Sequence, residues 1–300
     1  METFNKEQKI MNIGNVTLGG QPGENPTALV ASVFYKSHKA LKDEKTGEFD
    51  KDRVESEVND FLEIVDDIGT QAIIDVIGGY PEALINECSF IADLVDCPFL
   101  VDGLNDSSRI PAMKGLGELG LLDRAIFNSI DSNTSNEDLA KLKEYNVKNA
   151  VLLTFGGRAI FPKQKITLLK EKLIPAAQKA NIENSLVDTA VLDLPSMKVN
   201  SVTARLVKEE LGLPVGYAPS NAIFGWDYVK KYGKEARYAS FATVMGSCIN
   251  AGCDFILFGP IKFAKYIVPP LALIDGIDSY YRKRILRESI ADKNPFKRIF

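Results

Sequence analysis

The feature that most constrains the fold is an alternation of eight short apolar segments with amphipathic helical segments. The apolar segments are rich in β-branched and aromatic residues, as buried strands are. They span residues 27–35, 72–79, 99–103, 125–130, 149–155, 185–192, 214–219 and 255–260. Strict alternation of strand and helix favours a parallel sheet whose crossovers are all right-handed.

The number of units predicts the form of that sheet. Eight strand–helix units in about 250 residues fit a (β/α)8 TIM barrel. A doubly wound open sheet is the alternative, but such sheets usually carry a glycine fingerprint after the first strand. The sequence "VFYKSHK" (33–39) has no such glycines. A helical pattern follows each strand. Four of these patterns span 52–67, 136–145, 166–180 and 196–211. The others begin at Pro81, after Ser107 or Ser108 as the N-cap, after residue 219 with a break at Tyr232–Gly233, and at Ala264.

The two ends of the chain lie outside the repeating pattern. The sequence "KIMNIGNVTLGG" (9–20) predicts a β-hairpin that turns at Gly14–Asn15. We expect residues 1–26 to form a plug across the amino-terminal mouth of the barrel and residues 27–282 to form the barrel. Residues 283–300 form a basic carboxy-terminal tail, which we expect to be solvated together with the last helix.

Charge and composition exclude several classes of function. A net charge of −4 and a pI near 5.3 give no reason to expect nucleic-acid binding. No apolar run approaches the roughly 20 residues that a membrane helix needs. The four cysteines show no CxxC spacing and the chain has one histidine, so a zinc site is not expected. These features indicate a reduced, cytoplasmic protein without a metal site, in which the cysteines fill the core.

Polar side chains stand where the apolar strands end. They are Asp75, Asp102, Asn128, Asp188 and Asn221, on or just after the second, third, fourth, sixth and seventh strands. In a TIM barrel the carboxyl ends of the strands form the active-site face. The sequence therefore predicts that these carboxylates and amides converge on one mouth. Considered singly, Asp75 could cap a helix, Asn128 could bond to neighbouring backbone and Asn221 could be a helix N-cap.

Three kinds of site use such a cluster. Carboxylates can surround Mg²⁺ or Mn²⁺, and paired carboxylates can hydrolyse glycosides. A set of aspartates and asparagines also matches the edge of a planar heterocycle that presents N–H, amine and carbonyl groups together. The amide content, the single histidine and the single tryptophan favour the third kind, with a pterin or a purine as ligand.

Four motifs carry a resemblance to a known family. They are "FLVDGLNDS" (99–107), "AIFNSID" (125–131), "SLVDTA" (185–190) and "GYAPSNA" (216–222). In this order they resemble the pterin-binding TIM-barrel methyltransferases, which move a methyl group between a tetrahydropterin and a corrinoid protein. The start, "GGQPGENPTALVASVFYKSHK" with "GEFD" at 47–50, is similar to the H subunit of tetrahydromethanopterin S-methyltransferase and its bacterial relatives of the glycine betaine type. The resemblance covers nearly the whole chain.

The resemblance implies a function and a role for each site residue. The substrate would be methyltetrahydrofolate or methyltetrahydromethanopterin, and the partner would be a corrinoid protein that carries the cobalamin. Asp102, Asn128 and Asp188 would bind the pterin ring, with Asp75 as a further contact by strand position. Asn221 would bind the pterin near N5 and act in catalysis. The family also implies a homodimer.

Other functions stay open at this point. The chain could be a non-catalytic pterin-binding component of a larger complex, or a metal-dependent lyase on the same barrel. Dihydropteroate synthases share the pterin pocket but carry a basic Arg-x-His motif near the last strand. The matching region here, "FGPIKFAKY" (258–266), has lysines and no histidine.

Overall fold

The computed structural model describes residues 3–156 and 159–300 and contains a closed barrel of eight parallel strands. Around the barrel the strands follow chain order, and the first pairs with the last. They are β3 (Ala28–Val33), β6 (Gln71–Gly78), β7 (Phe99–Gly103), β8 (Ala125–Ile130), β9 (Asn149–Leu153), β10 (Asn184–Asp188), β11 (Val215–Tyr217) and β12 (Phe255–Pro260). Each strand lies at its predicted position, so the TIM-barrel prediction is confirmed.

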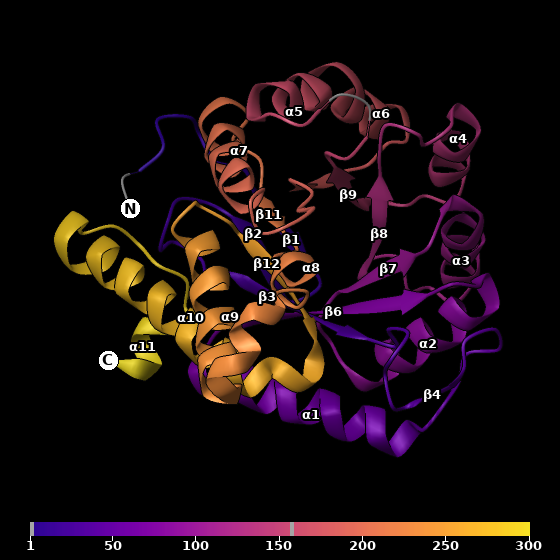
Figure 1. Ribbon diagram of the computed structural model, residues 1–300. Helices are drawn as coiled ribbons and strands as arrows, with labels where there is room; N and C mark the ends of the chain where they lie inside the picture. The colour runs from indigo at the N-terminus through magenta and orange to yellow at the C-terminus, as the bar shows by residue number, and fades with distance from the viewer. Residues whose placement is uncertain (1–2, 157–158) are drawn as a thin grey trace.

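The helices surround the strands (Figure 1). They are α1 (Lys51–Ile68), α2 (Pro81–Leu94), α3 (Asp106–Glu118), α4 (Asn136–Glu144), α5 (Pro162–Leu168) continued through a π-helical turn into α6 (Ile174–Lys179), α7 (Met197–Glu210), α8 (Ser220–Ile223), α9 (Gly233–Ile249) and α10 (Ala264–Tyr280), with a short α11 (Phe296–Ile299) near the end. A 3-10 turn, Asp227–Tyr232, separates α8 from α9, as the break predicted at Tyr232–Gly233 requires.

One predicted helix start is wrong. The N-cap of α3 is Asn105, whose side chain accepts a hydrogen bond from the backbone N–H of Ser108 at 3.2 Å. Ser107 and Ser108 lie inside the first turn. Asn and Ser cap helices about equally well, so the sequence alone did not decide among these neighbours.

The amino-terminal hairpin contacts the amino-terminal end of the barrel strand β6. It consists of β1 (Ile10–Ile13) and β2 (Val16–Gly19), joined at Gly14–Asn15 as predicted. The backbone N–H of Thr17 donates to Oε1 of Gln71 at 2.7 Å, and Gln71 is the first residue of β6. A second hairpin, β4 (Leu41–Asp43) with β5 (Glu48–Phe49), lies in the loop after β3 and was not predicted.

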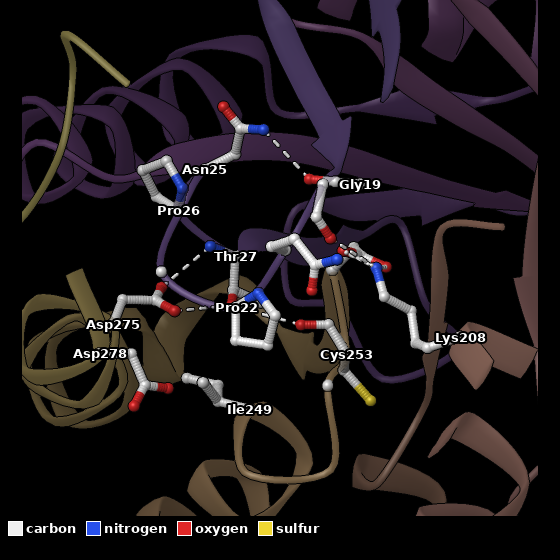
Figure 2. A pocket seen from close by; sticks show the side chains of 15 residues that line it. Gly19, Pro22, Asn25, Pro26, Thr27, Lys208, Ile249, Cys253, Asp275 and Asp278 are labelled. Carbon is white, nitrogen blue, oxygen red and sulfur yellow. Dashed lines mark hydrogen bonds and ion pairs between the residues drawn. The ribbon is translucent and has the colours of Figure 1, made fainter. Parts of the chain in front are cut away.

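Buried polar pairs tie the hairpin connection to α7 and α10 at this same end (Figure 2). Lys208 Nζ contacts both oxygens of Asp254, at 2.8 and 2.9 Å, and also donates to the carbonyl of Gly20. Asp275 accepts from the backbone N–H and the hydroxyl of Thr27, at 2.9 and 2.8 Å. These polar groups are paired with one another, which is typical of a structural face.

The carboxy-terminal segment is largely exposed, as expected, but two buried residues, Arg282 and Asn294, hold it in place. Arg282 is buried, and its guanidinium pairs with Glu288 at 2.9 Å and donates to the carbonyl of Ser289. Asn294 is also buried, with its amide on the hydroxyl of Ser279 at 3.0 Å. The sequence did not predict these two buried residues, because whether an arginine is buried depends on partners that the sequence does not locate.

The four cysteines are free and buried, as predicted for core residues. Within the described residues, no helix combines the length and the apolar character needed to cross a membrane.

Candidate functional site

Asp102, Asn128 and Asp188 lie near the carboxyl ends of β7, β8 and β10. Asp75 lies within β6, and Asn221 lies in α8, after β11. Strand register places Asp102 beside Asn128, and Asp188 beside Leu153 on one side and Gly216 on the other. Asp75 lies two residues below Ile77, which pairs with Asp102. Because residues i and i+2 of a strand point to the same face, Asp75 and Asp102 face the same side of the sheet. Asp75, Asp102, Asn128 and Asp188 are named the mouth cluster below.

Asp75 is the most deeply placed member. Its side chain is 2% exposed, and Oδ2 accepts a hydrogen bond from the hydroxyl of Ser32 at 2.6 Å. Oδ1 is buried and meets no N–H or hydroxyl donor within the described residues, which leaves the carboxyl of Asp102 as the neighbour able to donate. Burial raises the pKa of Asp75 to about 6, against the opposing effects of hydrogen bonds from Ser32 and Asp102. Asp75 lies within β6 and does not cap a helix.

Asp102 interacts with Asp75, and its pKa is raised further than that of Asp75. Its pKa is raised well above the usual range by burial and then by the charge of Asp75, with a smaller contribution from Asp188 and an opposing one from Arg109. Two neighbouring carboxyl groups cannot easily be ionised together in a poorly solvated site. The pair therefore offers one hydrogen-bond donor and several acceptors in the same small space.

Asn128 is held through its backbone. Its carbonyl accepts from the guanidinium of Arg109 at 2.7 Å, and the same guanidinium contacts Asp106 at 2.6 Å and lies over the ring of Phe127. Arg109 belongs to α3 and is largely buried. The half-buried side chain of Asn128 makes no hydrogen bond within the described residues. The amide is thus positioned by its own main chain and is available to a ligand.

Asp188 is the last residue of β10, and a lysine holds the two residues that follow it. Its Oδ1 accepts from the backbone N–H of Ala190 at 2.7 Å. Lys165, from α5, donates to the carbonyls of Thr189 and Ala190 and to Oδ1 of Asn200 at 3.0 Å. Burial raises the pKa of Asp188 to about 6, although the N–H of Ala190 and the charge of Lys165 act in the opposite direction. Burial also lowers the pKa of Lys165 to about 8.

Asn221 is the second residue of α8, which follows β11 directly. The N-cap position of α8 belongs to Pro219, and the exposed side chain of Asn221 makes no hydrogen bond within the described residues. The hydroxyl of the adjacent Ser220 donates to the carbonyl of Leu257 at 3.1 Å and fixes α8 to β12. The interpretation of Asn221 as a helix cap is therefore wrong.

Three residues that position the cluster were not predicted from the sequence, namely Ser32, Arg109 and Lys165. Ser32 ends the first strand as the other polar residues end theirs, so the same pattern could have found it. Lys165 precedes the buried Leu169 by one helical turn, and this phase indicates an inward direction. Arg109 shows no comparable signal, because its partner is a backbone carbonyl.

The described residues contain no group of three or more His, Cys, Asp or Glu side chains arranged to hold a metal ion. What the site offers instead is a set of carboxyl and amide groups with free hydrogen-bonding positions. Such a set suits a flat polar ligand whose edge carries both donors and acceptors.

Solved structures with the same fold include dihydropteroate synthases. The enzyme from Yersinia pestis superposes with a TM-score of 0.62 at 12% identity and covers 90% of this chain and 100% of that one. The enzyme from Vibrio fischeri also gives a TM-score of 0.62 at 12% identity, over 92% and 99% of the two chains. At this identity the likeness shows a common barrel fold.

Relatives in sequence are much nearer. The chain is 34% identical over 308 residues to the H subunit of tetrahydromethanopterin S-methyltransferase from Methanothermobacter thermautotrophicus, with 99% of each chain covered. It is 33% identical to the corresponding H subunit of Methanopyrus kandleri and 33% identical to the H subunit of a putative mtx methyltransferase of Methanosarcina barkeri, over 91% and 92% of each chain. The family model of the tetrahydromethanopterin S-methyltransferase MtrH subunit matches residues 6–290. The chain therefore belongs to the MtrH family of methyltransferase subunits.

Proposed function

We propose that this protein transfers a methyl group between N5 of a tetrahydropterin and a corrinoid protein. The observation that carries the proposal is the mouth cluster, in which groups able to bind a polar ring stand on four strands at one barrel mouth. Membership of the MtrH family supports the same reaction. The pterin is tetrahydrofolate or tetrahydromethanopterin, since both present the same ring edge to the protein.

Asp188 is suited to the aminopyrimidine edge of the pterin. That edge presents two adjacent N–H donors, which a carboxylate accepts well. Oδ1 of Asp188 already accepts from Ala190, so Oδ2 and the remaining lone pairs serve the ligand. Lys165 holds the two carbonyls that follow Asp188 and so fixes the direction of the carboxylate.

Asp102, Asp75 and Asn128 are suited to the other polar atoms of the ring. The proton that Asp102 keeps beside Asp75 can be donated to a ring acceptor, while the other carboxyl oxygens of the pair accept. Asn128 offers both an amide donor and a carbonyl acceptor. Together they would orient a flat ligand without requiring a strong acid or base in the protein.

Asn221 is the residue that we assign to the reacting nitrogen. A methyl group leaves a tertiary amine badly unless positive charge on N5 is stabilised. A neutral amide can turn its oxygen toward N5–H⁺ or its nitrogen toward the N5 lone pair, and it therefore serves both directions of transfer. The cobalt of the corrinoid supplies the nucleophile, so the barrel needs no nucleophilic side chain of its own.

The experiment is methyl transfer by the isolated protein with free cob(I)alamin and either methyltetrahydrofolate or methyltetrahydromethanopterin, followed by the absorbance of methylcobalamin. We expect transfer with at least one pterin, and much slower transfer with Asp188→Ala at the same subsaturating pterin concentration. Binding of the pterin by calorimetry, without transfer to cobalamin, would support instead a pterin-binding component that acts within a larger complex. The relatives named as subunits favour this as the second candidate.

Two further arms of the experiment test the remaining proposals. Loss of activity after EDTA treatment, restored by a divalent cation, would indicate a metal-dependent barrel enzyme. Homodimer formation stays a prediction, and a monomeric mass in light scattering at micromolar concentration would contradict it.

A further inference from the structure

A pocket of about 610 Å³ lies beside the mouth cluster, between the loops that follow β3, β6 and β7. Ligand pockets commonly have volumes of this order. Its wall is mainly apolar and includes Phe34, Leu41, Ile77, Pro81 and Leu104, with one buried acid, Glu87. The rim carries Lys36 and Glu44. Its opening thus carries these two charges beside the exposed side chains of Leu104 and Tyr80.

The pocket adjoins the mouth cluster through Ile77. Ile77 lies two residues after Asp75 on β6 and pairs in register with Asp102 on β7. The three side chains therefore point to the same side of the sheet, and Ile77 also lines the pocket. Gly78, the next residue, faces α2 and Glu87 on the opposite side of β6, so a ligand whose ring occupies the cluster would reach Glu87 over the carboxyl end of this strand.

Glu87 is the unusual residue in the wall. It comes from α2 and is 1% exposed, and its Oε2 has no hydrogen-bond partner within the described residues. A Cβ on Gly78 would lie 2.9 Å from this oxygen, so the glycine provides the space that the carboxyl group occupies. A buried polar atom without a partner is costly to the folded protein. Its presence at the wall of an open pocket therefore indicates a ligand that supplies the partner.

The charge state of Glu87 fits an uncharged ligand group. Burial raises the pKa of Glu87 to about 8, and the charge of Glu44 contributes in the same direction. At neutral pH the side chain is largely a carboxylic acid, which both donates and accepts a hydrogen bond. The group that it meets is thus an amine, an amide or a hydroxyl rather than an anion.

We propose that this pocket receives the arylamine tail that tetrahydropterins carry at C6, and that Glu87 hydrogen-bonds a polar atom of that tail. The inference rests on the proposed function. C6 is bonded to N5, so the tail leaves the ring beside the atom that carries the methyl group and must pass out through the mouth. The apolar wall packs against the aryl ring, and the polar rim meets the hydrophilic end of the tail.

A second pocket, of about 520 Å³, lies between α5 and the loops after β8 and β9. Its described lining residues include no residue of the mouth cluster and no register neighbour of Asp75 or Asp102. A substitution in this second pocket serves as a control, because it should not change the affinity for the tailed ligand.

The test compares two ligands on the wild type and four variants by calorimetry at pH 7. The ligands are 5-methyltetrahydrofolate and 6-methyltetrahydropterin, which has the ring without the arylamine tail. Glu87→Leu should lower the affinity for the tailed ligand about tenfold and change the affinity for the tail-less ligand by less than twofold. Glu87→Gln, which keeps hydrogen-bonding capacity, should retain the tailed affinity within about threefold. Thr167→Ala, in the second pocket, should change neither affinity.

Leu104→Asp provides a second variant that does not depend on Glu87. Leu104 is 79% exposed, so the substitution is compatible with folding, and it places a charge on the apolar wall. It should also weaken only the tailed ligand. Thermal unfolding without ligand should show Glu87→Leu at least as stable as the wild type, because the change removes an unpaired buried carboxyl group.

The outcomes separate this inference from the proposed function. If Glu87→Leu and Leu104→Asp lower the affinities for both ligands equally, or change neither affinity, the tail does not occupy the pocket. The proposed function is unaffected by that result. An effect on the corrinoid KM alone would assign the pocket to the partner protein and overturn the inference. If the wild type binds neither methyltetrahydrofolate nor methyltetrahydromethanopterin and transfers no methyl group from either, the proposed function fails first.

Discussion

The carboxyl groups of Asp75 and Asp102 face the same side of the sheet on neighbouring strands, and burial together with the charge of Asp75 raises the pKa of Asp102 well above its usual range. Ser32 donates to Asp75 from the neighbouring strand at 2.6 Å. The pair thus presents fixed donor and acceptor positions to a ligand in the mouth. Because Asp75 is buried and Asp102 is half-buried, their protonation also affects the stability of the fold.

The stability of the unliganded protein should fall as the pH rises from 4 to 8. The pKa of Asp75 is raised to about 6 in the folded protein, so the folded state binds more protons than the unfolded state over this range. Stabilisation by the protonated group is fully present below the unfolded pKa and is lost as the pH rises through about 6. Urea unfolding at pH 5 and pH 8 measures the fall.

A matched pair of variants identifies the source of that fall. Asp75→Asn has no titration at this position and should reduce the difference between the two pH values. Asp50→Asn changes the N-cap of α1 on the surface and should leave the difference unchanged. An equal difference in unfolding free energy between pH 5 and pH 8 for the wild type and Asp75→Asn would show that other buried acids, such as Asp275, control the pH dependence.

Pterin binding should weaken as the pH falls below about 6. The donor edge of the ring requires Asp188 as the carboxylate, and burial raises the pKa of this group to about 6. Below that pH a proton must be released on binding, so affinity should fall about tenfold per pH unit. Calorimetry in buffers of different ionisation enthalpy would detect the released proton at pH 5.5.

Asp188→Ala should lose about 1.5–3 kcal/mol of pterin affinity, the usual contribution of a hydrogen bond to a charged group. Its stability should change little, because the residue faces the mouth rather than the packed layers below. Wild-type affinity in this variant would show that the pterin lies elsewhere. Asp188→Asn should remove the pH dependence of whatever affinity remains.

The barrel could be predicted from sequence because each unit repeats the same local pattern. The predicted strands 99–103, 125–130 and 255–260 coincide with β7, β8 and β12, since apolar runs bounded by turn residues define both ends. The positions of Asp102, Asn128 and Asp188 followed from the rule that polar residues at strand ends face the mouth. The same alternation of strand and helix therefore led to both the fold and these positions.

The parts that could not be predicted depend on contacts between distant segments. Arg109 acts on the carbonyl of Asn128, and a carbonyl has no signature in the sequence. Lys165 is one lysine among several on a polar helix, and its depth in the structure distinguishes it. Glu87 gives no signal either, because an acid in an amphipathic helix is ordinarily solvated.

The amino-terminal end of the barrel should control stability and not pterin binding. The side chain of Lys208 is 1% exposed, and its Nζ pairs with Asp254 at 2.8 Å. Lys208→Met leaves a buried carboxyl group without its cation, and such losses cost about 3–5 kcal/mol of unfolding free energy. Pterin affinity of the folded fraction should be unchanged. The double variant Lys208→Met/Asp254→Asn should recover part of the loss.

Asn221→Ala should slow methyl transfer while leaving stability almost unchanged. Pro219, not Asn221, occupies the N-cap of α8, so the substitution removes no cap. The exposed amide has no partner to lose within the described residues, and surface changes of this kind stay within about 0.5 kcal/mol.

Loss of the N5 partner should lower the single-turnover rate by about tenfold to a thousandfold, with a smaller effect on pterin binding, because charge on N5 develops only in the transition state. Ser135→Ala is the matched control. Ser135 is a true N-cap, accepting from the N–H of Asp138 at 3.0 Å, and its loss should cost about 1 kcal/mol of stability with a normal rate per folded molecule. A normal rate in Asn221→Ala would leave N5 without a protein partner and would require another group, on this chain or on the corrinoid protein, to stabilise the charge.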